Sequence, residues 1–335
     1  MGSSAWPAEP PTGTLTRTIA MLVVAVVLAV LACDALAQRR NGFDLSDSEV
    51  PPARILAGGP PRDGIPAIDR PIFIDYGAAT HLADDDRVLG LEIDGDARAY
   101  PVAIMNWHEI VNDEIGGHAV AITYCPLCGS GIAYRSELAG RRLRFGVSGL
   151  LYNSDVLLYD RQTGSLWSQI ASRAISGPLR GTELPMLALE HTRWADWRSR
   201  HPGGRVLSRE TGYSRDYSRD PYRRYRLQPG TMFPVAGSDR RYPAKTWVIG
   251  LRLGGEARAY PFPQLERVDG GRIDEVVGGR PVTVVFDREH RSARAFDAAG
   301  RPLPGITAYW FAWIAFHPDT TVFAADAGAP ARAPR

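Results

Sequence analysis

The strongest constraint on the fold is a stretch of sequence that occurs twice. Residues 88–101 align without a gap with residues 248–261, and both copies end in Ala-Arg-Ala-Tyr-Pro. Each copy alternates apolar and polar side chains on both sides of a short turn, Asp94-Gly95 in the first and Gly254-Gly255 in the second. This pattern predicts a two-stranded hairpin closed by a tight turn in each copy.

The likeness between the two copies continues along the chain. Residues 112–117 match 273–279 with one extra residue, and the apolar run 120–124 matches 282–286. Four residues then recur at identical spacing: Trp194, Trp197, His201 and Pro202 in the first copy, and Trp310, Trp313, His317 and Pro318 in the second. We interpret this as a tandem duplication over residues 86–210 and 246–323, in which His201 and His317 define the fold.

The fold class follows from this pattern and from the composition. Thirty-four glycines and 26 prolines, with few long helical patterns, favour a turn-rich chain. We therefore expect a mainly β protein with some short helices, in which two strand-rich repeats pack as one unit. The first repeat also carries an insertion, roughly residues 138–190, that the second lacks.

The first 37 residues have the features of a targeting segment. Arg17 precedes an apolar run from Ile19 to Cys33, and Ala35-Leu36-Ala37 supplies the small residues that a signal peptidase requires. The run is short for a bilayer-spanning helix, which takes about 20 residues. A cleaved signal peptide, a retained membrane anchor and lipidation at Cys33 are the alternatives. Each of them predicts export, to the periplasm or to the outer face of the cytoplasmic membrane.

The remaining segments connect or flank the repeats. Residues 38–85 are predicted to form an extended lead-in, and residues 324–335 a disordered tail. Residues 211–245 are rich in Arg and Tyr, and we expect a surface loop tied by Arg–Asp pairs and Tyr hydrogen bonds. The net charge of +2 and the acidic residues within this loop argue against nucleic acid as a partner.

Chemistry is expected at Cys125-Pro126-Leu127-Cys128, which lies between two strand-like runs in the first repeat. Gly129-Ser130-Gly131 follows, so the element reads as strand, turn and strand rather than as the helix start of a thioredoxin-type site. Such a turn resembles the metal-binding knuckle of rubredoxins and zinc ribbons. In the second repeat Asp287 and His290 occupy the equivalent positions, which makes them candidates for a weaker second site.

Two functions remain open for the cysteine pair. In one, Cys125 and Cys128 cycle between thiols and a disulfide, as in a thiol-disulfide oxidoreductase, with His108 as the base or charge partner. In the other, the two thiolates and His108 hold Cu or Zn for delivery, sensing or catalysis. Either function implies a thiol- or metal-carrying partner in the envelope, where the N-terminal segment could also tether the protein to the membrane. A different alternative is a fixed disulfide in a non-catalytic binding module, whose site is built from Asp155, Asp160 and Arg161.

Polar residues are unusually dense in the strand-like segments around the cysteine pair. We expect most of them to form a supporting polar network: Asn106, Glu109, Ser148, Asn153, Asp155, Asp160, Arg161 and Gln169.

Together these stretches resemble the bacterial and archaeal family of envelope proteins known as domain of unknown function 3179. The resemblance rests on residues 106–109, 123–130, 145–155, 159–169 and the His201-Pro202 segment, and it covers most of residues 85–320. It identifies the family specifically. The family has no settled activity, but the selenocysteine that some members carry in the equivalent cysteine pair implies thiol redox chemistry and counts against a purely structural zinc.

Overall fold

The computed structural model describes residues 2, 21–24, 38–237 and 239–325. In this part of the chain the strands form six sheets, and the helices between them are short. The expected mainly β class is therefore confirmed. The predicted targeting segment lies mostly outside the described residues, as does most of the predicted tail. No helix in the described ranges has the length and apolar character needed to cross a bilayer.

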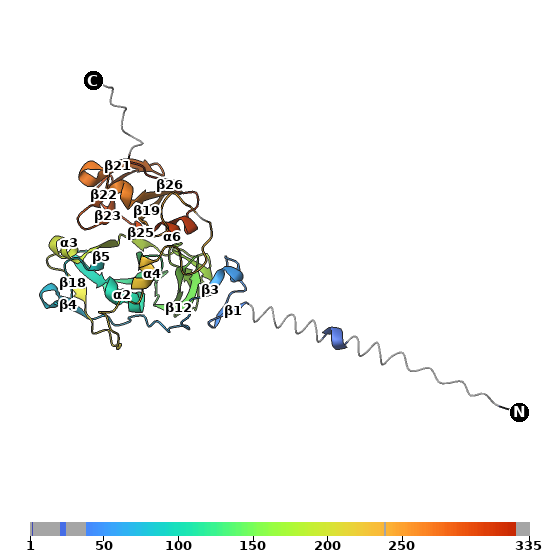
Figure 1. Ribbon diagram of the computed structural model, residues 1–335. Coiled ribbons are helices and arrows are strands. Elements are labelled where there is room, and N and C mark those ends of the chain that lie inside the picture. Colours follow the sequence, from blue (N-terminus) through green and yellow to red (C-terminus); the bar gives the residue numbers. More distant parts are fainter. Residues whose placement is uncertain (1, 3–20, 25–37, 238, 326–335) are drawn as a thin grey trace, which may run out of the picture.

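The first repeat forms a hairpin, a helix and a second set of strands (Figure 1). Its elements are β5 (Arg87–Ile93), β6 (Asp96–Pro101), α2 (Val102–His108), β7 (Ile110–Ile115), β8 (His118–Cys125), β9 (Ser130–Arg135), β17 (Glu190–Arg193), α3 (Trp194–Arg200) and β18 (Arg205–Leu207). β5 pairs with β6 and with β17 in antiparallel fashion, while β18 runs parallel to β6.

The second repeat follows the same order. Its elements are β19 (Trp247–Leu253), β20 (Glu256–Pro261), α5 (Phe262–Leu265), η3 (Asp269–Gly271), β21 (Arg272–Val277), β22 (Arg280–Asp287), β23 (Ser292–Asp297), β24 (Pro302–Leu303), β25 (Ile306–Tyr309), α6 (Trp310–Phe316) and β26 (Thr321–Val322). β19 pairs with β20 and β25 in antiparallel fashion, and β26 runs parallel to β20. The two halves thus share one pairing scheme, while their origin by duplication stays a prediction.

The repeated tryptophans explain why glycine recurs in the first strand of each hairpin. A Cβ atom at Gly90 would lie 2.2 Å from the Trp197 ring, and one at Gly250 would lie 2.3 Å from the Trp313 ring. The backbone of each strand must therefore pass directly over a buried indole. The ring of His201 stacks on Trp197 at 3.9 Å, and that of His317 lies 4.0 Å from Trp313.

One sheet joins the halves. β25 of the second half pairs with β9 of the first through Thr307 and Gly131, which gives an eight-stranded sheet. Figure 1 shows β25 and α6 at this junction, with β21–β23 on one side and β5, α2 and β12 on the other. The hairpin that carries the cysteines therefore lies at the centre of the molecule.

The insertion forms a sheet of its own. β12 (Phe145–Tyr152), β13 (Asp155–Asp160), β14 (Leu166–Ser168) and β15 (Arg173–Ser176) pair in sequence, and β3 (Ile55–Ala57) of the lead-in adds to the edge of β12. The lead-in is thus part of the folded body. The other short elements are β1 (Arg39–Arg40), β2 (Phe43–Asp44), η1 (Pro52–Arg54), β4 (Phe73–Asp75), η2 (Tyr76–Ala78), β10 (Glu137–Leu138), β11 (Arg141–Arg142), β16 (Met186–Leu187) and α4 (Arg223–Leu227).

Candidate functional site

The cysteines lie on the turn between β8 and β9. Cys125 is the last residue of β8 and pairs with Ser130, the first of β9. Between them the chain turns through Gly129 at φ 63°, where a Cβ atom would lie 2.9 Å from Trp247 and 3.1 Å from Tyr309. A glycine is required here both by the backbone conformation and by the aromatic rings packed against it.

A second turn, from the insertion, meets the cysteines. Asn153 and Ser154 connect β12 to β13, both with positive φ, as in the two-residue hairpin turns that favour Asn at the first position. The carbonyl oxygen of Ser154 accepts from both thiols, at 3.4 Å from Cys128 Sγ and 3.7 Å from Cys125 Sγ. Asp155, the next residue, then enters the core beside the sulfur atoms.

Two thiols and one carboxyl group therefore form a compact cluster. Cys125 Sγ, Cys128 Sγ and a carboxylate oxygen of Asp155 all lie within 4.8 Å of one another. Both cysteines are free thiols, which differs from the fixed disulfide of the alternative prediction. The backbone N–H of Ile170 donates to Asp155 Oδ2 at 3.0 Å, whereas the buried Oδ1 has no hydrogen-bond partner.

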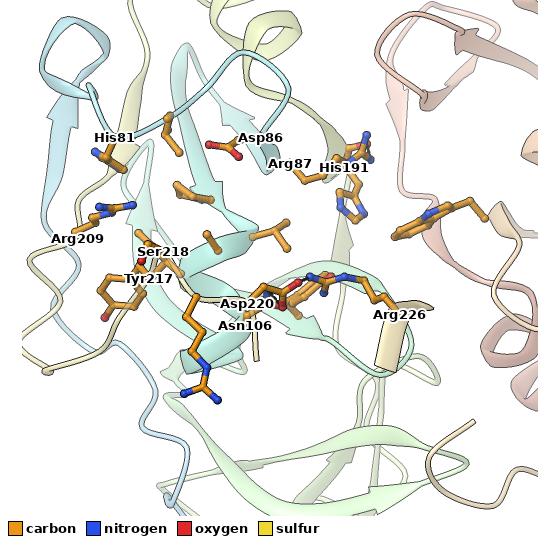
Figure 2. A pocket seen from close by; sticks show the side chains of 18 residues that line it. His81, Asp86, Arg87, Asn106, His191, Arg209, Tyr217, Ser218, Asp220 and Arg226 are labelled. Atoms are coloured by element: carbon orange, nitrogen blue, oxygen red, sulfur yellow. Dashed lines mark hydrogen bonds and ion pairs between the residues drawn. The ribbon is translucent and has the colours of Figure 1, made fainter. Parts of the chain in front are cut away.

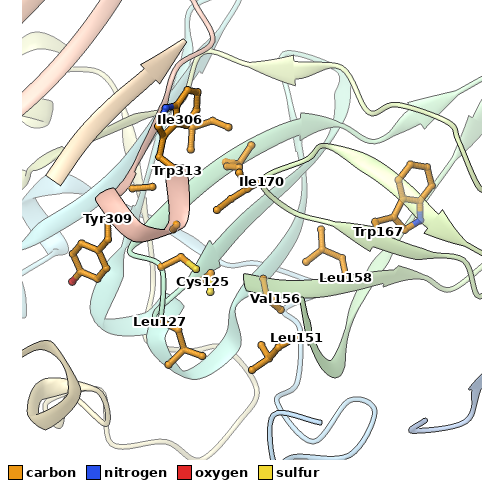
Figure 3. Close-up of a cluster of buried hydrophobic side chains, with 14 of the residues drawn as sticks. Cys125, Leu127, Leu151, Val156, Leu158, Trp167, Ile170, Ile306, Tyr309 and Trp313 are labelled. Carbon is orange, nitrogen blue, oxygen red and sulfur yellow. The ribbon is translucent and has the colours of Figure 1, made fainter. Parts of the chain in front are cut away.

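The cluster is closed to solvent. Cys125 is 1% exposed, and Cys128 and Asp155 are fully buried. Figure 3 shows Cys125 among apolar side chains from three parts of the chain, including Leu127, Val156 and Tyr309. An ionised group in this environment loses its hydration, and the apolar surroundings offer no counter-charge to compensate for that loss.

Burial therefore shifts every acidic group in the cluster toward its protonated form. It raises the pKa of the Cys125 thiol and raises that of Cys128 well above its usual value. It also raises the pKa of Asp155 to about 7. Glu109, a buried residue in the left-handed conformation at the end of α2, has its pKa raised to about 8 by burial and then by the charge of Asp155.

The connecting loop, residues 211–245, covers the cluster. Tyr225 of α4 is buried, and its hydroxyl donates to the Leu127 carbonyl in the cysteine turn at 2.9 Å. Further along, the Phe233 carbonyl accepts from Ser154 Oγ at 3.0 Å. The prediction of a surface loop was therefore incomplete. Its Tyr hydrogen bonds and Arg–Asp pairs occur, but part of the loop is packed into the core.

His108 lies elsewhere, on α2. Its Nδ1 contacts the Pro66 carbonyl at 2.7 Å and its Nε2 contacts the Tyr217 hydroxyl at 2.6 Å. Both ring nitrogens are thus engaged, and the third group beside the two sulfur atoms is the Asp155 carboxylate. Asp155 reaches the cysteines from a separate hairpin, the β12–β13 hairpin. The sequence favoured His108 instead because His108 lies closer to the cysteines along the chain.

Two of the predicted network residues hold the two turns in place, Gln169 at the cysteine turn and Asn153 at the β12–β13 turn. Gln169 accepts from Ser130 Oγ at 2.6 Å and donates to Thr123 Oγ1 at 2.9 Å, which fixes the two strands that flank the turn. Asn153 accepts from the Ala236 N–H at 3.0 Å and donates to the Ala315 carbonyl at 3.2 Å. They position the hairpins that bring the cluster together.

The other network residues lie apart from the sulfur atoms. At the irregular part of β12, Ser148 Oγ donates to the Leu157 carbonyl of β13 and accepts from the Leu150 N–H. Asp160 accepts from Trp167 Nε1 at 3.0 Å, and Arg161 pairs with Asp69 at 2.9 Å. Asn106 donates to Asp220 at 3.3 Å. Asp155, Asp160 and Arg161 thus have separate partners.

The equivalent turn of the second half also forms a cluster. Asp287 pairs with Ser292 in the hairpin, as Cys125 does with Ser130, and it lies with His290 and Asp196 within 4.8 Å. The carboxylates here are already paired. His290 Nδ1 lies 2.9 Å from Asp287 Oδ2, and Arg200 donates to both carboxylate oxygens of Asp196.

Comparison with known proteins identifies the family. A family model described as protein of unknown function (DUF3179) matches residues 62–302. The chain belongs to this family. The match includes the cysteine turn, the insertion and most of the second half, so the DUF3179 region contains the whole buried cluster. No curated protein and no solved structure gives a match.

Proposed function

We propose that this DUF3179 protein holds a transition-metal ion, Zn²⁺ or a copper ion, through Cys125, Cys128 and Asp155. The observation that carries the proposal is the grouping of acidic side chains without a cation. Two thiols, Asp155 and Glu109 are buried together, and neither carboxylate has an ion pair within the described residues. A metal cation would supply the missing positive charge and allow the ligands to deprotonate.

The donor set fits this class of metal. Thiolate sulfur favours Zn²⁺ and Cu⁺ over Mg²⁺ or Ca²⁺, which prefer oxygen ligands. Zinc–sulfur bonds of about 2.3 Å in a tetrahedron place neighbouring ligand atoms roughly 3.8 Å apart, which is compatible with a cluster whose atoms all lie within 4.8 Å. The Ile170 N–H would orient the carboxylate through Oδ2 and leave Oδ1 to the metal.

A second candidate function is thiol-disulfide exchange. It is favoured by the free thiols beside Asp155, whose pKa of about 7 suits a group that accepts a thiol proton at neutral pH. In this reaction Cys125 and Cys128 would be oxidised to a disulfide, and a disulfide of a partner protein would receive the two electrons and two protons and become two thiols. The raised pKa of both cysteines and their complete burial argue against rapid attack on such a partner.

One preparation distinguishes the two functions. The protein is purified anaerobically, stripped with a chelator and titrated with Zn²⁺ and with Cu⁺, alongside Cys128→Ser and the matched variant His290→Ala from the second hairpin. We expect one ion per chain in the native protein and in His290→Ala, and none in Cys128→Ser. Failure of both metals to bind stoichiometrically would overturn the metal site. A disulfide that then equilibrates with glutathione would favour the redox function.

We further infer that the protein is exported and receives its metal or its electrons from a partner in the envelope. The support is the apolar N-terminal run followed by Ala35-Leu36-Ala37. Cell fractionation and N-terminal sequencing of the mature protein test this inference. Recovery of the intact chain in the cytoplasm would contradict it.

A further inference from the structure

A second candidate site lies where the two halves and the connecting loop meet. It is a pocket of about 440 Å³, lined by the start of β5, by α2, by residues 217–226 of the connecting loop and by Trp247 of the second half. Figure 2 shows these side chains arranged around one cavity, with Arg87 and His191 across from Asp220 and Arg226.

This pocket is separate from the thiol cluster. Tyr124 lines the pocket, and Cys125 follows it in β8. Neighbouring residues of a strand point to opposite faces, and the two side chains accordingly pack in different apolar clusters. A ligand here would lie across β8 from the sulfur atoms, so the pocket does not depend on the proposed metal.

Buried polar atoms without partners gather in this pocket. Four of its lining residues have such an atom: His81 Nε2, Asn106 Oδ1, His191 Nδ1 and Arg226 Nη1. Asn106 and His191 are only 4% and 3% exposed. Native proteins pair almost all buried polar groups, so four unpaired atoms around one cavity indicate that a ligand supplies the missing partners.

The charge of the lining is positive. Four arginines, at positions 87, 209, 219 and 226, face two aspartates, Asp86 and Asp220. Asp220 pairs with Arg226, but no ion pair of the other three arginines occurs within the described ranges. Arg87 is half-buried and donates only to backbone carbonyls, and this partial burial lowers its pKa to about 10, so that it stays charged at neutral pH. A half-buried guanidinium without an ion-pair partner favours an anion nearby.

The rest of the lining is apolar and aromatic. Trp247 and Tyr124 flank His191, with ring centroids 5.0 Å and 6.1 Å away, and Val102 and Ile104 of α2 complete the wall. A small inorganic ion would leave this surface uncovered. A ligand with an apolar or aromatic body and one anionic end would contact both parts of the pocket.

We propose that the pocket binds a small organic anion, whose carboxylate or phosphate lies against the arginines and whose apolar body lies against Trp247. Arg226 and His191 offer hydrogen bonds to the anionic group, and Asn106 Oδ1 accepts a hydrogen bond from a donor on the ligand. Carboxylate and phosphate share this chemistry. They differ in charge and size, which a matched pair of probes can separate.

The test uses three probes that share one aromatic ring: benzoate, phenyl phosphate and the neutral benzyl alcohol. Binding to the full chain is measured by calorimetry at low and high salt. We expect at least one anion to bind tenfold more tightly than benzyl alcohol, and the difference to shrink in high salt. The stronger of the two anions identifies the group that the pocket prefers.

Two variants of the lining and two controls locate the binding site. Arg226→Gln should weaken binding of the anion about tenfold, whereas Arg224→Gln, an exposed neighbour on α4 outside the pocket, should leave it unchanged. Arg209→Gln removes an exposed arginine of the lining without disturbing the core and should weaken binding about threefold. Cys128→Ser should bind the anion as the native protein does. Equal binding of benzyl alcohol, or equal loss in Arg224→Gln and Arg226→Gln, would overturn the proposal.

Discussion

The β8–β9 turn and the β22–β23 turn occupy the same place in the two halves, and each presents two side chains three residues apart to an acidic residue from another element. In the first half these are Cys125, Cys128 and Asp155. In the second half they are Asp287 and His290, beside Asp196.

The two clusters differ in how their charges are balanced. In the second half, ion pairs and hydrogen bonds lower the pKa of Asp196 and Asp287, although burial opposes this. In the first half, burial raises the pKa of Asp155 without a compensating cation. The carboxylates of the second-half cluster are thus balanced by positive partners, whereas the carboxyl group of the first-half cluster is not. The hairpin fold does not itself require cysteines, so their presence in one half points to a function there.

The largest expected effect comes from removing the carboxylate of the first-half cluster, with the carboxylate of the second-half cluster as the control. On the proposed metal site, Asp155→Asn should raise the dissociation constant of the ion roughly a thousandfold, or about 4 kcal/mol, because a ligand is lost. Asp196→Asn should leave metal binding unchanged. Competition with a chromophoric chelator measures both constants. Equal metal affinity in Asp155→Asn and the native protein would contradict the assigned ligand.

The second prediction concerns pH. Because the folded-state pKa of Glu109 is raised from 4.5 to about 8, its stabilising contribution is complete below pH 4.5 and is lost as the pH rises toward 8. The metal-free protein should therefore lose roughly 3 kcal/mol of unfolding free energy between pH 5 and pH 8 through this group. The lowered carboxyl pKa values of the second cluster act in the opposite direction, with stability lost at acid pH.

Denaturant unfolding at several pH values checks this prediction. Glu109→Gln should flatten the decline above pH 5, while Glu114→Gln, an exposed carboxylate on β7, should not change it. Added metal should reverse the trend, because the ligands bind the ion only after they deprotonate. A decline that is unchanged in Glu109→Gln would show that other groups cause it.

The third prediction tests the equivalence of the two halves outside the turns. Gly90→Ala and Gly250→Ala should each cost about 2 kcal/mol, because the added methyl group overlaps a buried indole. Gly203→Ala, where nothing lies within 4 Å, is the control. Urea unfolding gives the three values. A large loss from only one of the glycine variants would show that the two hairpins pack differently.

Much of the fold could be predicted from sequence, because hairpins have a local signature. The alternation of residues 88–101 and 248–261, with Gly in the turns, was enough to place β5–β6 and β19–β20. The cysteine turn was found in the same way. Asp155 was predicted as part of a supporting network, or of a binding site with Asp160 and Arg161, but not as a neighbour of the cysteines. Its contact with them depends on how the insertion folds back, and no spacing along the chain encodes that packing.

The burial of the cysteines was likewise beyond the sequence, and the final prediction tests what keeps them covered. Tyr225→Phe removes the hydroxyl that donates to the Leu127 carbonyl and should cost about 1 kcal/mol. If the connecting loop opens to expose the thiols, their reaction with a thiol reagent should become roughly fivefold faster. Tyr213→Phe, on an exposed tyrosine of the same loop, should leave the rate unchanged. An unchanged rate in Tyr225→Phe would mean that the thiols are reached by another route, such as separation of the β12–β13 turn from the cysteine turn.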